Sequence, residues 1–133
     1  MFKDLLEKLK ELNLPKGKFA IFGSGPMGPK GLRDPRDLDI IVTEDIFSDF
    51  KKRPDFKLGQ KKSDNEYLEK DGIEIYTNWN LEDWDINKLI NEAEIIDNLP
   101  FVRIEEVLRW KRAYNREKDI KDIELIENYL NRK

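Results

Sequence analysis

Asp37 and Asp39 carry the clearest chemical signal in this sequence of 133 residues. Because side chains alternate along a strand, both aspartates point to one face of the strand that the apolar run over 40–42 predicts. Two carboxylates this close repel each other and are poorly solvated on a largely buried strand. The pair therefore needs either a metal ion or a basic partner, for which Arg33 or Arg36 is close enough in the sequence.

A Gly-Ser turn comes shortly before the aspartates. The apolar run over 19–22 predicts a buried strand, and Gly23 and Ser24 end it abruptly. A glycine lets backbone amides approach a phosphate closely, and a serine adds a hydroxyl donor, so both residues are candidates for nucleotide binding. The alternative is that they form only a tight turn. Lys30 and Arg33, in the Gly- and Pro-rich segment that follows, either contact phosphate or are solvated.

The composition limits the chemistry that the chain can perform. It has no histidine and no cysteine, which excludes His-based triads, disulfides and thiolate zinc sites, so any acid–base chemistry must use Asp, Glu, Lys or Tyr. Charged residues make up 40% of the chain but the formal net charge is only −3, which argues against coating of nucleic acid by bulk charge. No apolar run is long enough for a membrane span and no signal-peptide pattern is present, so we expect a cytoplasmic protein with no membrane partner.

Hydrophobic periodicity and turn signals predict the elements that must position these residues. Helices are predicted over 2–12, 44–52 and 86–91, the second with Thr43 as its N-cap. Strands are predicted over 19–22, 37–42, 56–60, 66–70, 73–77 and 94–97. Asp71-Gly72 predicts a two-residue hairpin between two of these strands, residues 79–84 a loop, and residues 98–100 a turn.

The C-terminal third predicts a helical hairpin. Two apolar stripes lie on either side of a polar connection over 115–119, and they consist of Ile104, Val107, Leu108 and Tyr114, and of Ile120, Ile123, Ile126 and Leu130. Lys111 falls on the first apolar face. We expect it to pair with Asp119 or Asp122 across the hairpin rather than to reach a phosphate. Together these elements predict one domain over 1–133 of the α/β (α+β) class, with a small mixed sheet and helices packed on it.

The order of these features resembles the nucleotidyltransferase superfamily, whose fold is shared with DNA polymerase β. Gly23-Ser24 matches the Gly-Ser element of that family, Asp37 and Asp39 match its paired aspartates, and Glu74 matches its third carboxylate. The segment over 107–123 is similar to the helical ending of small uncharacterised bacterial and archaeal members. One difference is that Gly and Pro residues over 25–31 allow at most about one helical turn after Gly-Ser, where many members have a longer helix.

The resemblance implies that the chain transfers a nucleoside monophosphate from an NTP, such as ATP, to an acceptor. Asp37, Asp39 and Glu74 would be the catalytic residues and the ligands of two Mg²⁺ (or Mn²⁺) ions about 3.5–4 Å apart, because these ions prefer carboxylate oxygens and water. The strands of Asp39 and Glu74 should then be neighbours. The acceptor would be a protein, a small molecule or an RNA end, and a second copy of the chain or a partner protein would supply its binding surface.

Two other interpretations of the same residues stay open. The chain could be a non-catalytic nucleotide- or partner-binding module of the same fold, as in a toxin–antitoxin-like pair. It could also be a scaffold in which the aspartates pair with arginines and Glu74 is solvated on an exposed sheet face. Three converging carboxylates favour the enzyme, because a module without metal chemistry has no need for them.

Overall fold

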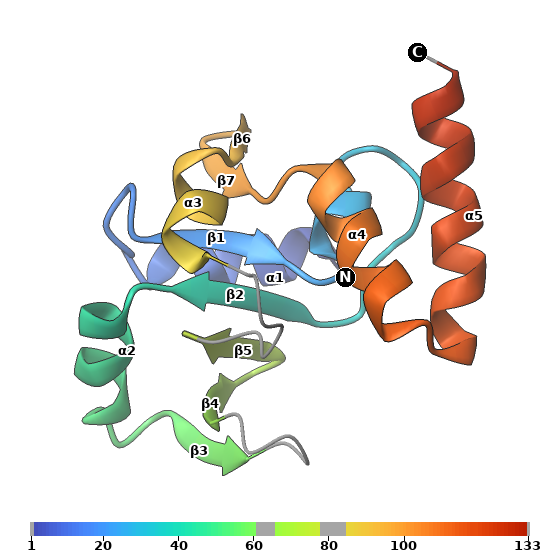
Figure 1. Ribbon diagram of the computed structural model, residues 1–133. Coiled ribbons are helices and arrows are strands. Elements are labelled where there is room, and N and C mark those ends of the chain that lie inside the picture. The colour runs from blue at the N-terminus through green and yellow to red at the C-terminus, as the bar shows by residue number, and fades with distance from the viewer. Residues whose placement is uncertain (1, 61–65, 78–84, 133) are drawn as a thin grey trace.

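A mixed β-sheet of seven strands forms the centre of the protein within the residues that the computed structural model describes, which are 2–60, 66–77 and 85–132 (Figure 1). The strands lie in the order β3-β4-β5-β2-β1-β7-β6. They are β1 (Phe19–Phe22), β2 (Leu38–Val42), β3 (Lys57–Gln60), β4 (Glu66–Lys70), β5 (Ile73–Tyr76), β6 (Glu94–Ile96) and β7 (Leu99–Phe101). The predicted α/β (α+β) class with a mixed sheet is confirmed.

Two parallel pairs define the middle of the sheet. β2 is parallel to β5 and β1 is parallel to β7, whereas β1 and β2 are antiparallel to each other. The pairs at the two edges, β3 with β4 and β6 with β7, are antiparallel, as are β4 and β5. Asp71 and Gly72 join β4 to β5 with φ angles of 54° and 88°, the left-handed conformation that the Asp-Gly signal predicts.

Helices cover both faces of the sheet (Figure 1). They are α1 (Phe2–Glu11), α2 (Glu44–Lys51), α3 (Ile86–Asn91), α4 (Ile104–Tyr114) and α5 (Glu117–Asn131). Ile21 and Ile40 pack with α1 and α2 in one apolar cluster, and Phe22 and Ile41 pack with α3, α4 and α5 in the other. Because strand side chains alternate, Asp39 lies on the same face as Ile41, under α3, α4 and α5.

The elements predicted from the N-terminus through 97 are confirmed to within a residue or two at their ends, except for the loop predicted over 79–84, which lies outside the described residues. The turn predicted over 98–100 is wrong. The turn is at Asp97 and Asn98, which have φ angles of 51° and 67°, and Leu99 and Pro100 already belong to β7. The proline hid this strand, because a residue without a backbone N–H is rare inside a sheet.

The C-terminal hairpin is confirmed, but two details of the prediction are wrong. The connection is shorter than 115–119, because α5 begins at Glu117 after Asn115, whose φ of 48° ends α4 in the left-handed conformation. Ile120 is 57% exposed, and the buried residues of α5 are Asp119, Asp122 and Ile126. The buried face of α5 thus combines Ile126 of the predicted stripe with two carboxylates, and Ile123 and Leu130 are partly buried against the same apolar cluster.

A single short 3₁₀ turn, η1 (Gly25–Met27), follows the Gly-Ser turn. This agrees with the expectation that glycines and prolines here allow at most about one helical turn. No helix in the described part of the chain is long and apolar enough to cross a membrane.

Candidate functional site

Asp39 and Glu74 lie directly opposite each other on the parallel strands β2 and β5. Residues that are opposite in a sheet share one face and hold their Cβ atoms about 4.5–5.5 Å apart. The expectation that the strands of these two residues are neighbours is therefore confirmed. Like charges in this arrangement repel each other, so the pair is a place where a cation would be stabilised.

The row of acidic residues continues onto the next strand. Glu69 of β4 lies opposite Glu74, so Asp39, Glu74 and Glu69 are aligned across three adjacent strands. Glu69 was not among the site residues predicted from the sequence. The signal was present in the hairpin, because the two-residue turn fixes the register that pairs Glu69 with Glu74.

The Gly-Ser turn lies against Asp39. Gly23 follows Phe22, which is the register partner of Asp39, and Gly23 has a φ of 64°. A Cβ atom at position 23 would lie 2.5 Å from Oδ2 of Asp39. Both the backbone conformation and this close approach therefore require glycine, and they bring the turn and the carboxylate into direct contact.

Tyr76 holds the carboxylate of Glu74. Its hydroxyl donates a hydrogen bond to Oε1 of Glu74 at 2.5 Å, and its ring stacks on Tyr67 with 5.5 Å between the ring centroids. Burial raises the pKa of Tyr76 above its usual value, and the hydrogen bond to Glu74 and the charge of Asp39 raise it further. Tyr76 therefore stays protonated and remains a donor to Glu74.

The hydroxyl of Ser24 is held by two cations. Nη1 of Arg33 and Nζ of Lys111 each donate to Oγ of Ser24 at 3.2 Å. Nη1 of Arg33 also donates to Oδ2 of Asp122 at 2.5 Å, and Nζ of Lys111 lies 3.1 Å from the same oxygen and 3.6 Å from Oδ1 of Asp119. We refer to Arg33, Lys111, Asp119 and Asp122 as the ion cluster, in which Lys111 and the two aspartates are buried and Arg33 is partly exposed. The expectation that Lys111 pairs with Asp119 or Asp122 is confirmed.

The other predicted site residues lie less centrally. Asp37 is exposed in the bend before β2, and the β2–β5 ladder begins one residue later with Leu38 and Ile73. Lys30 donates to Oε1 of Glu94 at 2.9 Å, and this hydrogen bond raises its pKa. Lys30 is therefore engaged by the edge strand β6. Among the predicted nucleotide-binding residues, Gly23 contacts Asp39, and Ser24 contacts Arg33.

The donor set of the pair fits a hard divalent cation, because Asp39 and Glu74 offer carboxylate oxygens from one face of the sheet. In the described ranges 2–60, 66–77 and 85–132, no group of three or more Asp, Glu, His or Cys side chains is arranged to hold a metal ion. Asp37 thus does not complete such a group with the other two carboxylates, and the site of three carboxylates stays a prediction.

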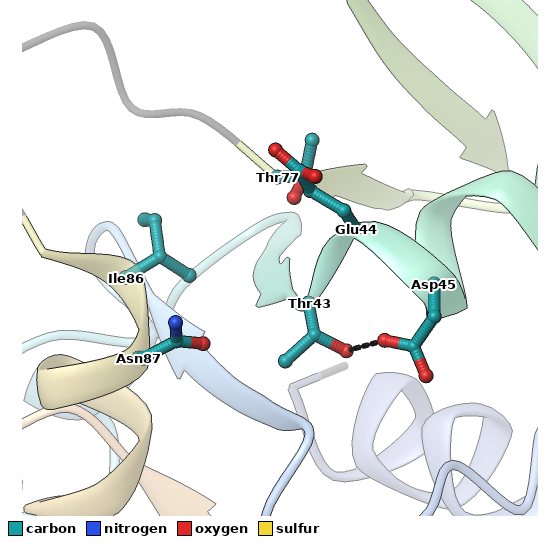
Figure 2. A pocket seen from close by; sticks show the side chains of 6 residues that line it. All are labelled: Thr43, Glu44, Asp45, Thr77, Ile86 and Asn87. Carbon is teal, nitrogen blue, oxygen red and sulfur yellow. Dashed lines mark hydrogen bonds between the residues drawn. The ribbon is translucent and has the colours of Figure 1, made fainter.

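A cavity of about 430 Å³ lies at the opposite end of β2 and β5, where Thr43 and Thr77 follow these strands (Figure 2). It is lined by Thr43, Glu44, Asp45, Thr77, Ile86 and Asn87. Thr43 is the N-cap of α2, as predicted, but its hydroxyl donates to the carboxylate of Asp45 rather than capping the backbone. Hydrogen bonds from Lys18 and Thr43 lower the pKa of Asp45 to about 2. The acidic lining would repel phosphate, so we do not assign nucleotide binding to this cavity.

Comparisons of the chain with family models, with curated proteins and with solved structures found no match. The resemblance to nucleotidyltransferases therefore depends on the residues described above.

Proposed function

We propose that this chain is a metal-dependent nucleotidyltransferase, which transfers a nucleoside monophosphate from an NTP to an acceptor and releases pyrophosphate as the α–β phosphoanhydride bond breaks. One arrangement carries the proposal: Asp39 and Glu74 lie opposite each other on parallel strands, with the Gly-Ser turn in contact with Asp39. Carboxylates that attract a cation thus adjoin a turn whose Ser24 hydroxyl can donate a hydrogen bond to a phosphate. A tight turn alone would not need this contact with Asp39.

In this proposal Asp39 and Glu74 hold Mg²⁺ or Mn²⁺, and Asp37 joins them by turning from its exposed bend toward the same face. The bound ions would stabilise the attacking and leaving oxygens of the transfer. The hydrogen bond from Tyr76 to Oε1 fixes the orientation of the Glu74 carboxylate, and Oε2 would then be the oxygen that contacts the ion. Ser24 donates to the phosphates, and Arg33, whose side chain is 42% exposed, is accessible to them.

We further propose a cytoplasmic protein whose acceptor is a protein, a small molecule or an RNA end. The described elements form one sheet with its covering helices, and none of the described residues forms a second unit that would bind an acceptor. A second copy of the chain or a partner protein would then complete the acceptor site.

The test is incubation of the purified protein with a cell extract, Mg²⁺ and each α-labelled NTP in turn. We expect label on one discrete species with the wild-type protein and none with Asp39→Asn. Glu69→Gln is the matched control, since it removes a carboxylate from the same row but from outside the proposed ligands. Stabilisation by Mg²⁺-NTP without any labelled species would instead support the non-catalytic binding module. The absence of both label and stabilisation would contradict both functions.

A further inference from the structure

We propose that Lys111 is a positioning residue, which fixes the hydroxyl of Ser24 so that its proton is donated to an incoming phosphate. That the proton goes to a phosphate rests on the proposed function. That Lys111 positions the hydroxyl of Ser24 does not. Lys111 belongs to α4 and Ser24 to the turn after β1, and 87 positions separate them in the sequence.

The first reason concerns the hydrogen bonds that the hydroxyl of Ser24 can make. A serine hydroxyl has one proton to donate and two lone pairs that accept. Both contacts to Oγ of Ser24 come from cations, Lys111 and Arg33, each at 3.2 Å. Neither an ammonium nor a guanidinium group can accept a hydrogen bond. The proton of Ser24 is therefore directed to a third group, and the two cations polarise the O–H bond.

The second reason is that Lys111 is buried. Lys111 is only 2% exposed, although it lies on the otherwise apolar face of α4 with Val107 and Leu108. A buried ion pair that serves only stability can often be replaced by apolar residues without loss. Apolar side chains at positions 111, 119 and 122 together could fill the same space, but they could not donate to Ser24. The contact with Ser24 is thus the feature of Lys111 that such a replacement would not reproduce.

The turn after β1 needs such support. η1 is only three residues long, so no long helix holds the turn in place. The C-terminal hairpin supplies the missing restraint, because Asp122 of α5 holds both Lys111 and Arg33, the two residues that contact Ser24. Figure 1 shows α4 and α5 beside the end of β1 where this turn begins.

The first measurement uses the protein without nucleotide. Lys111→Met should fold, because Asp122 keeps Arg33 as its partner and Asp119 keeps Arg116. We expect the backbone amide NMR signals of residues 23–25 to shift and to exchange faster with solvent in this variant. Arg112→Met is the matched control: it breaks an exposed ion pair with Glu127 across the same two helices, and it should leave these amides unchanged.

Lys111→Gln serves if Lys111→Met does not fold. The shorter, neutral side chain withdraws the donor from both Ser24 and Asp122, but its amide remains a polar group beside the buried carboxylates. Unchanged amide signals over 23–25 in a folded variant of Lys111 would overturn the inference.

The second measurement is a double-mutant cycle on the binding of Mg²⁺-ATP and of the other Mg²⁺-NTPs. Ser24→Ala and Lys111→Met should each weaken binding by about tenfold, since a hydrogen bond to a charged group is lost. The double variant should bind no more weakly than either single one, because both changes remove the same donor. Effects that multiply would show that Lys111 acts independently of Ser24, and would overturn the inference. If the wild-type protein binds no NTP, the proposed function fails, and the amide measurement alone decides whether Lys111 positions Ser24.

Discussion

The two charged sites on the side of the sheet covered by α3, α4 and α5 are the Asp39–Glu74 pair and the ion cluster, and they have different partners. Asp122 is held by two cations, Lys111 and Arg33, whereas the hydrogen bond that Glu74 accepts from Tyr76 comes from a neutral phenol. A carboxylate that receives a full positive charge from the protein is stabilised without a ligand. A neutral donor orients a carboxylate but supplies no compensating charge. The ion cluster is therefore a site in which cations of the protein balance the carboxylates, whereas the phenol of Tyr76 serves to orient Glu74.

The largest effect on stability is expected from removing one negative charge from the ion cluster. Asp122→Asn removes a carboxylate from Lys111, which is 2% exposed and keeps only Asp119 at 3.6 Å, so we expect a loss of about 3 kcal/mol in the free energy of unfolding. The measurement is urea denaturation without ligand. Glu127→Ala, which breaks an exposed ion pair on the same helix, is the control and should change stability by about 1 kcal/mol or less. A loss as small as that of the control would mean that the cluster gives no support.

A substitution in the Gly-Ser turn tests the contact between this turn and Asp39. Gly23→Ala forces a left-handed residue and places its Cβ 2.5 Å from Oδ2 of Asp39, so we expect a loss of about 2–3 kcal/mol. Gly31→Ala is the matched control, because Gly31 has a similar φ of 71° but nothing within 4 Å of its Cβ position. Thermal denaturation of both variants separates two causes of the stability loss: the left-handed backbone conformation, which both variants share, and the clash with Asp39, which occurs only at position 23. Equal losses would mean that Asp39 moves away from the turn at little cost.

Acid should lower the free energy of unfolding through Asp119 of the ion cluster, by less than the two substitutions above do. Burial alone would raise the pKa of Asp119, but the hydrogen bonds from Arg116 and the charge of Lys111 outweigh burial and lower it. Because the folded pKa lies below the unfolded value of about 3.9, the unfolded chain binds the proton first. The stabilisation is therefore complete above the unfolded pKa and is lost as the pH falls through the folded one.

This pH dependence can be measured as the difference in free energy of unfolding between pH 6 and pH 3. Asp119→Asn should lose less stability over that interval than the wild-type protein does. The same loss in both proteins would assign the acid sensitivity to other carboxylates.

The smallest change in ligand-free stability is expected at the carboxylate pair. Asp39→Asn and Glu74→Gln relieve like-charge repulsion, so the free energy of unfolding should stay within about 0.5 kcal/mol of wild-type or rise slightly. With Mg²⁺-NTP present, Asp39→Asn should abolish the ligand-induced rise in melting temperature, and Glu74→Gln should reduce it. NTP without metal should stabilise the wild-type protein much less. A large loss of ligand-free stability in both variants, with an unchanged ligand response, would remove the catalytic proposal.

The positions of Asp39, Glu74 and the Gly-Ser turn could be predicted because they depend on local signals. Strand alternation fixes the face of each carboxylate, and the Asp-Gly turn fixes the hairpin that carries Glu74. The pairing of Lys111 with the aspartates of α5 was also predicted. The role of Arg33 was not predicted, because Arg33 reaches Asp122 from 89 positions away and no local pattern encodes this contact. Of the predicted stripe on α5, Ile120 is exposed, whereas Ile126 is buried and Ile123 and Leu130 are partly buried.

The link between Ser24 and Lys111 also has a consequence for the order of events during synthesis. Ile21 of β1 pairs with Phe101 of β7, and the turn after β1 is held by a residue of α4. Contacts between such distant parts of a chain form late and slow the folding of a domain. On the ribosome, the strands β1 and β2 would emerge long before the helix that secures the turn between them. The nascent chain should therefore pass through an intermediate in which the sheet has begun to pair but Gly23 and Ser24 are still mobile.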